Sequence, residues 1–247
     1  MAASSETVVL ITGANQGLGF ECVKKLAAEQ PNYHILLGSR SLEKGQQAAA
    51  AIDNFAKNTT VEALELDVDD DDSIAKAVKH VEQKYGRLDV LLNNAGIMSS
   101  PSASGFRADM TLVMQTNAIS AACVTEAFLP LTKKSSSPRI VFMSSGWGSI
   151  MRCLDTSQAY YGYDAKPYFT SKAAMNMIGA QYAVQLGKEG FKVNIVSPDF
   201  RSTNLNGFHE YGGDPAGGAL QACKMIVSTD KDGPNGTFTE LDGVVPW

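Results

Sequence analysis

Two kinds of hydrophobic pattern alternate along the chain. Short runs rich in β-branched residues, from TVVLITG to KVNIVSP, predict buried strands, and longer segments with apolar residues three and four positions apart predict amphipathic helices. The helical stretches, FECVKKLAAEQ and SIAKAVKHVEQKYG among them, end at Gly, Pro or Asn, as helices commonly do. The predicted strands cover residues 7–11, 33–37, 61–66, 88–92, 138–143 and 191–196, and residues 236–240 form a candidate seventh.

This alternation is typical of an α/β protein with a three-layer, doubly wound parallel sheet and helices on both faces. No repeat or low-complexity linker interrupts it, so we expect a single domain over residues 1–247 with about seven strands. A chain of this length buries roughly three quarters of its unfolded surface, which is enough to enclose a site that excludes most water.

Composition narrows the choice of partner. The net charge is −5 and there is no basic stripe, which argues against nucleic acid or an anionic membrane surface. The four cysteines are far apart and the histidines number only three, so neither a disulfide framework nor a zinc site is indicated. The stretch MAASSETVVLITG lacks the features of a signal peptide, and no apolar run approaches the ~20 residues of a membrane span. We expect a soluble, cytoplasmic protein that binds a small molecule.

The most conspicuous charge run is DVDDDDSI at 67–74. Adjacent carboxylates suggest a metal site, but consecutive Asp side chains point in divergent directions. Asp71, Asp72 and Ser73 stand just before a helical pattern, where such residues cap free N–H groups and complement the helix dipole. We therefore predict no metal. Asp67 differs because it ends a predicted strand, where open α/β sheets bind ligands.

A glycine-rich turn, TGANQGLGF, follows the first predicted strand directly. Glycines at positions 13, 17 and 19 would let the backbone approach a pyrophosphate, whose charge sits on the N-terminus of the helix beginning near Leu18. A purely structural strand-to-helix turn is the alternative, and the position after the first strand favours a dinucleotide site of the Rossmann type.

The end of the second predicted strand, YHILLGSR, indicates which cofactor fits. An NAD site has a carboxylate there for the ribose hydroxyls, whereas this chain has Ser39 and Arg40. A hydroxyl and a guanidinium can bind a 2′-phosphate through charge-assisted hydrogen bonds. A solvated arginine is the alternative, and together with the glycine turn the pair favours NADP(H).

Further polar segments fall at strand ends or on helices that face the same crevice. NNAG at 93–96 follows the fourth strand, Asn117 lies inside a helical stretch, and Ser145 follows the fifth strand. Next comes YYGYDAKPYFTSK, in which only Tyr168 of four tyrosines has a lysine, Lys172, four residues later. That spacing places both side chains on one face of a helix.

This set of motifs, in this order, resembles the short-chain dehydrogenase/reductase family, whose TGxxxGxG pattern is matched from Thr12 to Gly19. The resemblance covers essentially the whole chain. The stretches GANQGLG and LLGSRSLEKG are most similar to the carbonyl reductases that use NADPH. The resemblance therefore implies a Rossmann fold and reduction of a ketone or aldehyde.

The resemblance also implies roles for four residues. Tyr168 would be the general acid that protonates the carbonyl oxygen, and Lys172, with the positive ring of the oxidised cofactor, would lower the pKa of Tyr168 and hold the nicotinamide ribose. Ser145 would hydrogen-bond the substrate oxygen, and Asn117 would hold a water linking Lys172 to solvent. The alternatives are a surface helix pair, a helix cap and an ordinary buried Asn.

The cofactor contacts follow from the same resemblance. Asp67 would lie at the adenine, Asn94 at the adenosine ribose, and the Arg201 backbone with Thr203 at the nicotinamide carboxamide. The full set is Gly13, Asn15, Gly17, Leu18, Gly19, Ser39, Arg40, Asp67, Val68, Asn94, Ala95, Gly96, Tyr168, Lys172, Arg201 and Thr203. Asp199 stands where the family usually has glycine, so we expect the backbone there to avoid a glycine-only conformation and its carboxylate to lie near the nicotinamide or the substrate.

Two segments on the substrate side depart from the family or vary within it. The stretch between Ser145 and Tyr168 is about ten residues longer than the family's spacing and must bulge over the crevice. Its tyrosines and Trp147 either form a wall that favours bulky or planar carbonyl substrates or merely pack the loop against the domain. Residues 204–218 lie where the family has a substrate lid, in which His209 and Tyr211 either line the site or are exposed.

Three functions fit the sequence: an NADPH-dependent carbonyl reductase, an alcohol dehydrogenase working oxidatively, and a nonenzymatic NADP(H) sensor. The acid and the serine are both present, which favours an enzyme, and Ser39 with Arg40 favours reduction. Family members are commonly homodimers or homotetramers that pack through the helices at 109–133 and 166–186, a surface that the extra segment could block.

Overall fold

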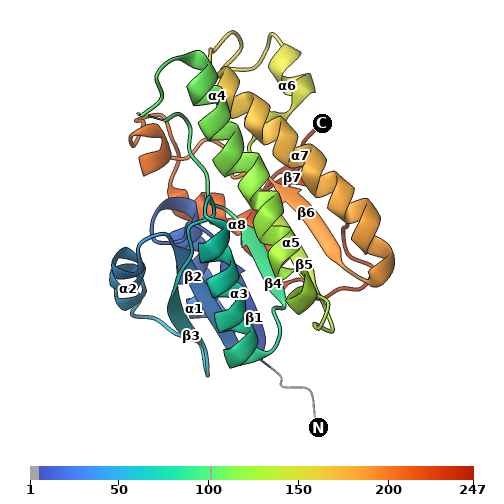
Figure 1. Ribbon diagram of the computed structural model, residues 1–247. Coiled ribbons are helices and arrows are strands. Elements are labelled where there is room, and N and C mark those ends of the chain that lie inside the picture. Colours follow the sequence, from blue (N-terminus) through green and yellow to red (C-terminus); the bar gives the residue numbers. More distant parts are fainter. Residues whose placement is uncertain (1–5, 101) are drawn as a thin grey trace.

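The fold is an eight-stranded sheet covered by helices, seen in a computed structural model that describes residues 6–100 and 102–247 (Figure 1). The strand order is β3-β2-β1-β4-β5-β6-β7-β8, and every pair is parallel except β7 with β8. This confirms the doubly wound parallel sheet, with eight strands in place of about seven. The strands are β1 (Thr7–Ile11), β2 (Tyr33–Ser39), β3 (Thr60–Glu65), β4 (Val90–Asn93), β5 (Arg139–Met143), β6 (Lys192–Val196), β7 (Phe238–Glu240) and β8 (Gly243–Val244).

The predicted strands match β1 to β7, with ends displaced by at most two residues. The strand that the pattern missed is β8. It has only two residues, both exposed, and it forms through antiparallel pairing with β7. Such a strand contains no hydrophobic run that a pattern could detect.

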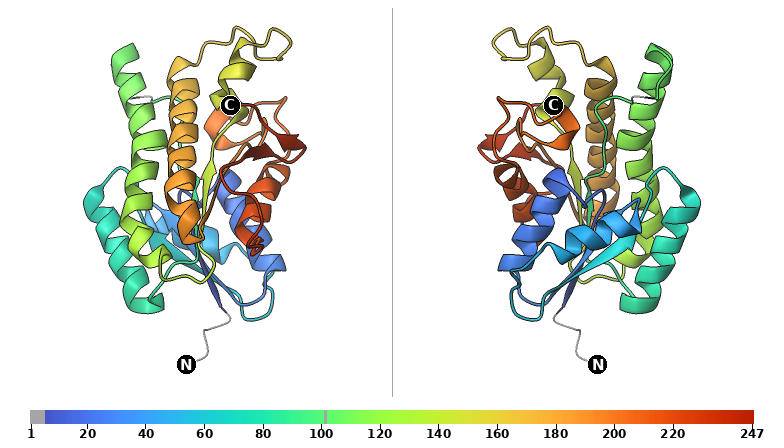
Figure 2. Two further views of the ribbon diagram at one scale, coloured as in Figure 1. Left: turned by 90° about the vertical axis from the view of Figure 1, so that its right-hand side faces the viewer. Right: turned by 90° about the vertical axis from the view of Figure 1, so that its left-hand side faces the viewer.

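Helices cover both faces of the sheet, as Figure 2 shows. Val9 and Ile11 of β1 belong to the core on one face, and Val8 and Leu10 to the core on the other, as the two-residue period of a strand requires. Burial on both faces explains why the strands are continuous hydrophobic runs. The first face is covered by α1 (Gly17–Glu29), α2 (Leu42–Ala50) and α8 (Pro215–Val227), and the second by α3 (Asp71–Tyr85), α5 (Ser120–Thr132) and α7 (Lys166–Leu186).

One helical stretch is longer and more apolar than the sequence analysis expected. α4 (Phe106–Met114) continues through a π-helical turn (Gln115–Ile119) into α5, and an 18-residue window within the combined 27 residues has a mean hydropathy of 1.2, enough by length and composition to cross a membrane. This stretch packs on the sheet through buried residues that include Val124 and Phe128, and it also buries the polar Asn117. Its apolar character is therefore explained by packing within the domain.

The acidic run at 67–74 forms a helix start, with one correction. Asp70, not Asp71 to Ser73, is the N-cap: its carboxylate accepts from the N–H groups of Asp72 at 2.9 Å and Ser73 at 3.4 Å. Asp71 and Asp72 lie in the first turn, where their charge favours the helix dipole. Across residues 6–100 and 102–247, no cluster of three or more His, Cys, Asp or Glu side chains is arranged to hold a metal ion.

The topology gathers the predicted motifs at one edge of the sheet. β1 neighbours β2 on one side and β4 on the other, so the chain connections diverge there and leave a crevice at the carboxyl ends of these strands. The segments after β1, β4, β5 and β6 all start at this edge. Figure 1 shows α6 (Ile150–Leu154) and the loop after it beyond the same edge, next to the start of α7.

Candidate active site

Tyr168 and Lys172 lie on one face of α7, close to the end of β5. The helix can approach the sheet because Gly179 has no side chain: a Cβ there would lie 2.7 Å from the Ile195 side chain. Tyr168 and Lys172 are 7% and 3% exposed, so this is a buried pair and not a surface pair. Lys172 Nζ lies 5.7 Å from the centre of the Tyr168 ring and donates to the Met143 carbonyl at 2.8 Å.

Burial shifts both groups away from their charged forms. Burial raises the pKa of Tyr168 to about 12, and a hydrogen bond with Ser145 acts in the opposite direction. Burial lowers the pKa of Lys172 to about 7. We expected Lys172 and the oxidised cofactor together to lower the pKa of Tyr168. The protein groups by themselves do not lower it. The phenol stays protonated, which is the form that a general acid requires.

Ser145 has the capping role that the sequence analysis gave as the alternative, and its hydrogen bond to a substrate oxygen stays a prediction. Its Oγ accepts from the Trp147 N–H at 3.2 Å and so caps the 3₁₀ turn Gly146–Gly148, and its side chain also hydrogen-bonds Tyr168. The turn lies directly on α7, because a Cβ on Gly148 would be 2.8 Å from the Lys172 carbonyl carbon. Capping therefore fixes the hydroxyl beside the phenol.

Asn176 is a positioning residue that the sequence analysis missed. Ser144 Oγ donates to Asn176 Oδ1 at 2.5 Å, and Asn176 Nδ2 donates to the Gly148 carbonyl at 3.1 Å. Asn176 thereby joins both sides of Ser145 to α7. It lies four residues after Lys172 and eight after Tyr168, so the helical spacing that linked those two residues could also have revealed it.

Asn117 lies in the π-helical turn and is completely buried. Its side chain accepts from the Ile97 N–H at 2.8 Å, donates to the Ile97 carbonyl at 2.8 Å and donates to Ser171 Oγ at 2.9 Å. A Cβ on Gly96 would lie 3.1 Å from Asn117 Oδ1 and 3.6 Å from Lys172 Nζ, so the amide is beside the lysine. The side chain ties the loop after β4 to α7, and its link to a water stays a prediction.

The glycine turn has the shape that a dinucleotide requires. Gly13 and Gly17 have positive φ values of 60° and 58°, which favour glycine. A Cβ on Gly13 would lie 2.9 Å from Ala95 Cα, and one on Gly19 would lie 2.5 Å from Asn94 Nδ2. Glycine is therefore required at 13 and 19 by close packing of the turn against the loop after β4, and the approach of a phosphate to this turn stays a prediction.

Asn94 and Thr12 hold this turn in place. The Thr12 hydroxyl accepts from the N–H groups of Asn94 at 2.9 Å and Ala95 at 3.0 Å, and Asn94 Nδ2 donates to the Thr12 carbonyl at 2.8 Å. In this geometry the Asn94 amide faces the glycine turn, and a ribose contact from Asn94 stays a prediction.

The surroundings of the turn fit a nicotinamide dinucleotide. Gln16 makes no side-chain cap at the start of α1, so the N–H groups of the first turn, near Asn15 and Leu18, are available to a phosphate. A narrow cleft next to the turn is lined by Thr12, Val68, Asn93, Ala95, Thr116 and Ala121. Among the described residues, Asn93 Oδ1 is buried without a hydrogen-bond partner.

Ser39 and Arg40, the predicted 2′-phosphate pair, have different surroundings. The Ser39 hydroxyl is buried and donates to the Ser41 carbonyl at 2.8 Å, so it closes the turn into α2. Arg40 is exposed, and its guanidinium makes no ion pair with the rest of the described chain. Of the two, Arg40 is the group that can reach a phosphate without breaking an existing bond. Asp67, at the end of the third strand region, is half-buried and accepts from the Asp69 N–H at 3.1 Å.

The loop after β6 corrects our expectation for Asp199. Its φ is +60°, in the region that favours glycine and that Asp tolerates better than most residues, so the backbone keeps the glycine-like conformation. The carboxylate accepts from Arg201 Nη2 at 2.8 Å. Thr203 is buried, and a Cβ on Gly17 would lie 3.9 Å from Thr203 Cβ and 3.0 Å from Asn204 Oδ1. The loop after β6 thus lies against the glycine turn, which is the position that a segment covering a bound dinucleotide would need.

The extra segment carries an aromatic cluster that continues onto the loop after β6. Trp147 is its centre: the ring centroids lie 6.0 Å from Tyr168 and 6.3 Å from Phe200, the latter nearly parallel at 18°. Further contacts to Trp147 come from Tyr160 at 5.6 Å, Tyr163 at 5.3 Å and Phe169 at 4.8 Å. Aromatic surface therefore begins at the phenol of Tyr168. In the 204–218 segment, His209 and Tyr211 are exposed, and His209 packs edge-on against Phe200 at 5.3 Å.

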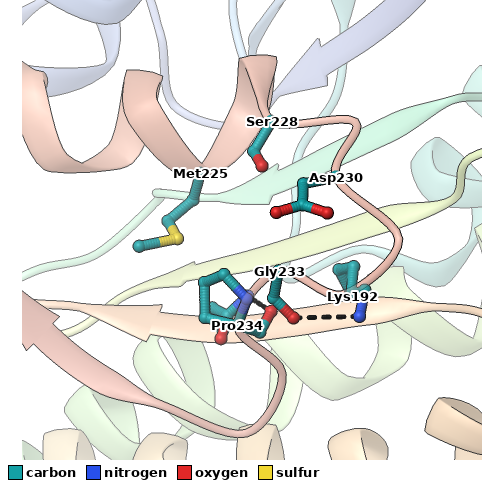
Figure 3. Close-up of a pocket in the computed structure, with 7 residues that line it drawn as sticks. Lys192, Met225, Ser228, Asp230, Gly233 and Pro234 are labelled. Atoms are coloured by element: carbon teal, nitrogen blue, oxygen red, sulfur yellow. Dashed lines mark hydrogen bonds between the residues drawn. The ribbon is translucent and has the colours of Figure 1, made fainter.

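A second cleft lies at the opposite end of the sheet and has no part in this site. It is lined by Lys192, Asn194, Met225, Ser228, Asp230, Gly233 and Pro234 (Figure 3). Lys192 Nζ donates to the Gly233 carbonyl at 2.9 Å across it. Lys192 begins β6, whereas the catalytic groups lie beyond the carboxyl ends of the strands.

The fold and the site together define a short-chain dehydrogenase, and the chain belongs to this family. The family profile described as short chain dehydrogenase matches residues 7–210. The protein is accordingly an oxidoreductase of the class that acts on alcohol and carbonyl groups with a nicotinamide cofactor.

Individual relatives agree with this assignment. The short-chain dehydrogenase anuI of Penicillium roqueforti is 37% identical over 248 residues, which cover 98% of this chain and 95% of the relative. The structure of NADPH-bound carbonyl reductase from chicken fatty liver matches with a TM-score of 0.79 and 27% identity over 98% of this chain and 99% of that one. A 3-ketoacyl-(acyl-carrier-protein) reductase from Brucella melitensis complexed with NADH, 18% identical, shares the fold with a TM-score of 0.79 over 95% and 96% of the two chains.

Proposed function

We propose that the protein is an NADPH-dependent carbonyl reductase that reduces aromatic or otherwise bulky ketones and aldehydes to alcohols. The observation that carries the proposal is a buried phenol, Tyr168, hydrogen-bonded to Ser145 with Lys172 beneath its ring and an aromatic wall in front of it. A substrate carbonyl placed there would meet two hydroxyl groups in a site of low dielectric constant.

The chemistry of the residues follows from this arrangement. NADPH, when bound, supplies the hydride. Ser145 Oγ holds the carbonyl oxygen and stabilises its growing negative charge, while Tyr168 Oη transfers its proton to that oxygen. Lys172 has a pKa near 7, so it can exchange a proton close to neutral pH and, when charged, it favours the phenolate that the transfer leaves.

Arg40 supports the preference for NADPH over NADH. It is exposed next to Ser39 at the end of β2, where the adenosine ribose lies in this fold, and no acidic residue ends the strand. A guanidinium can bind a 2′-phosphate through two charge-assisted hydrogen bonds. The neighbouring structure of NADPH-bound carbonyl reductase supports the same choice.

Trp147 supports an aromatic substrate class. Its ring lies between the catalytic Tyr168 and Phe200, and these rings offer flat apolar faces against which a planar substrate can stack. Small aliphatic carbonyl compounds would leave this surface largely uncovered and would therefore bind more weakly.

Exposed apolar side chains also support a homodimer or homotetramer. Ile119, Met177 and Val184 on the α5 and α7 side are 46%, 62% and 74% exposed, so the inserted segment leaves them uncovered. Light scattering of the purified protein is expected to give twice or four times the mass of one chain, and a monomer would contradict this part of the proposal.

The activity itself is tested by a panel of aromatic and aliphatic carbonyl compounds, each assayed with NADPH and with NADH. We expect NADPH oxidation with aromatic ketones or aldehydes and kcat/KM about tenfold or more lower with NADH. The matching alcohols with NADP⁺ test the oxidative direction. Failure of every carbonyl compound to oxidise NADPH, in protein that binds NADPH, would contradict the proposed function.

A further inference from the structure

Four charged side chains from three segments meet beside the turn that carries Ser145, and none of them takes part in the proposed reaction. Arg152 of α6 binds Glu240 at the end of β7 with two hydrogen bonds, of 2.9 and 2.6 Å. Arg201 Nη2 binds Asp199 Oδ2 at 2.8 Å, and the Asp199 carboxyl group lies next to that of Glu240, so that burial and this neighbouring carboxylate raise the pKa of Asp199. We call this set of four residues the R-E-D-R network.

The network is largely shielded from water. The side chains of Arg152 and Glu240 are 22% and 16% exposed, and those of Arg201 and Asp199 are 19% and 34% exposed. A bidentate arginine–carboxylate pair in such surroundings holds a fixed geometry, unlike an exposed pair. A glycine at position 199 would lack the carboxylate that pairs with Arg201.

On one side the network lies against Gly146, the residue that follows Ser145. The Arg152 guanidinium covers Gly146, since a Cβ there would lie 2.9 Å from Arg152 Nη1. The Gly146 N–H donates to Ser197 Oγ at 3.0 Å, and the Asp199 N–H donates to the same oxygen at 3.4 Å. The turn that carries Ser145 and the loop after β6 are therefore bound to each other directly below the network.

On the other side the network holds the base of the 204–218 segment. Arg201 Nε donates to the Pro198 carbonyl at 2.7 Å, and the Arg201 carbonyl accepts from Asn206 Nδ2 at 2.8 Å. Cβ atoms on Gly213 and Gly217 would lie 2.8 and 3.0 Å from Arg201 Nη1, so the guanidinium fills the space at the start of α8. Movement of Arg201 would displace the loop that approaches Gly17.

We propose that the R-E-D-R network is a positioning device that couples the inserted segment over the substrate to the loop over the cofactor. Arg152 and Glu240 touch neither substrate nor cofactor in this arrangement and act through Ser145 on one side and through the 198–206 loop on the other. Removing one charge leaves its partner partly buried and unpaired, so both segments would lose their fixed relation. This inference rests on the proposed function only for its kinetic readout.

The test compares three variants with the natural protein. Glu240→Gln keeps the shape and removes the charge, and Arg152→Lys keeps the charge and removes the two-bond geometry. Asp164→Asn is a matched control in the same inserted segment, because within the described chain Asp164 pairs only with the exposed Lys166. NADPH binding is measured by its fluorescence without substrate, and kcat and KM are measured with an aromatic ketone. Circular dichroism and thermal unfolding confirm that each variant is folded.

We expect Glu240→Gln to weaken NADPH binding about fivefold and to lower kcat about tenfold, Arg152→Lys to show smaller changes in the same direction, and Asp164→Asn to show neither. The charge-reversed double variant Arg152→Glu with Glu240→Arg is expected to recover a large part of the lost NADPH affinity, which a merely destabilised variant would not. If Glu240→Gln leaves NADPH affinity and kcat unchanged, the proposed coupling is overturned. If Glu240→Gln does not fold, the same result in Arg152→Lys overturns it. Natural protein without NADPH binding would instead refute the proposed function.

Discussion

The two halves of the active-site crevice are built in different ways. On the cofactor side, main chain is closely packed: glycines at 13 and 19 let the turn after β1 lie against the loop after β4, and Thr12 and Asn94 hold it through hydrogen bonds. On the substrate side, large side chains fill the site, with Trp147 at the centre of an aromatic cluster. A turn fixed by backbone packing suits a cofactor of constant shape, whereas side chains can change with the substrate, so we expect the substrate side to determine which carbonyl compound is reduced.

Tyr168 lies where the two halves meet, and its loss is expected to have the largest effect. Tyr168→Phe removes the transferable proton and leaves the glycine turn and the aromatic wall unchanged. General acids of this kind contribute factors of 10² to 10⁴, so kcat should fall about 10³-fold. NADPH affinity, measured by fluorescence, should stay within about threefold. A variant that retains kcat would show that another group supplies the proton.

Arg40 tests the cofactor side alone. Arg40→Asp replaces a guanidinium with a carboxylate that repels the 2′-phosphate, so the KM for NADPH is expected to rise about 30-fold, while the KM for NADH changes by less than about threefold. Steady-state kinetics with both cofactors and one ketone measure the ratio. Lys44→Ala is the control for a general loss of positive charge, because Lys44 is an exposed residue in the first turn of α2. Equal changes for both cofactors would contradict a 2′-phosphate contact.

Trp147 tests the substrate side alone. Trp147→Ala removes the ring that contacts Tyr160, Tyr163, Phe169 and Phe200, so the KM for an aromatic ketone should rise about tenfold. A small aliphatic aldehyde makes little use of that surface, and its kcat/KM should change less than about threefold. Tyr161→Ala, in the same segment, is the control, because the exposed Tyr161 makes no ring contact among the described residues. A uniform loss for both substrates would show that the cluster only packs the loop.

The buried Lys172 is expected to have a smaller effect, which appears in how the stability of the folded protein depends on pH. Its pKa is about 7 in the folded protein against an ordinary value of 10.5, so between these values the unfolded chain holds a proton that the folded chain has lost. The free energy of unfolding therefore rises from about pH 7 to about pH 10, and below pH 7 the buried charge costs stability. Relative to Lys172→Met, the natural protein should gain several degrees in Tm between about pH 6.5 and pH 9.5. Parallel Tm profiles for the two proteins would contradict the lowered pKa.

The sequence predicted the cofactor half in more detail than the substrate half, for physical reasons. A glycine turn after a strand and a Tyr–Lys pair on one helix face are local patterns, and both were found where the spacing put them. The strands were found because burial on both faces makes each a continuous apolar run.

Contacts between distant parts of the chain could not be predicted in this way. Arg152 and Glu240 are 88 residues apart, and nothing in either segment indicates the other. The bond of the Ser39 hydroxyl to the Ser41 carbonyl depends on the turn into α2. The aromatic wall stayed one of two alternatives because composition does not show which rings meet.

The central claim is that hydride passes to a carbonyl carbon in front of Tyr168. It is tested most directly with NADPH carrying deuterium at the transferable position, mixed in a single turnover with an aromatic ketone and followed by mass spectrometry of the product. We predict deuterium on the carbinol carbon in the natural protein and almost none within the same time in Tyr168→Phe loaded with the same NADPH. Unlabelled alcohol from the natural protein, or equally fast labelling by Tyr168→Phe, would contradict the account.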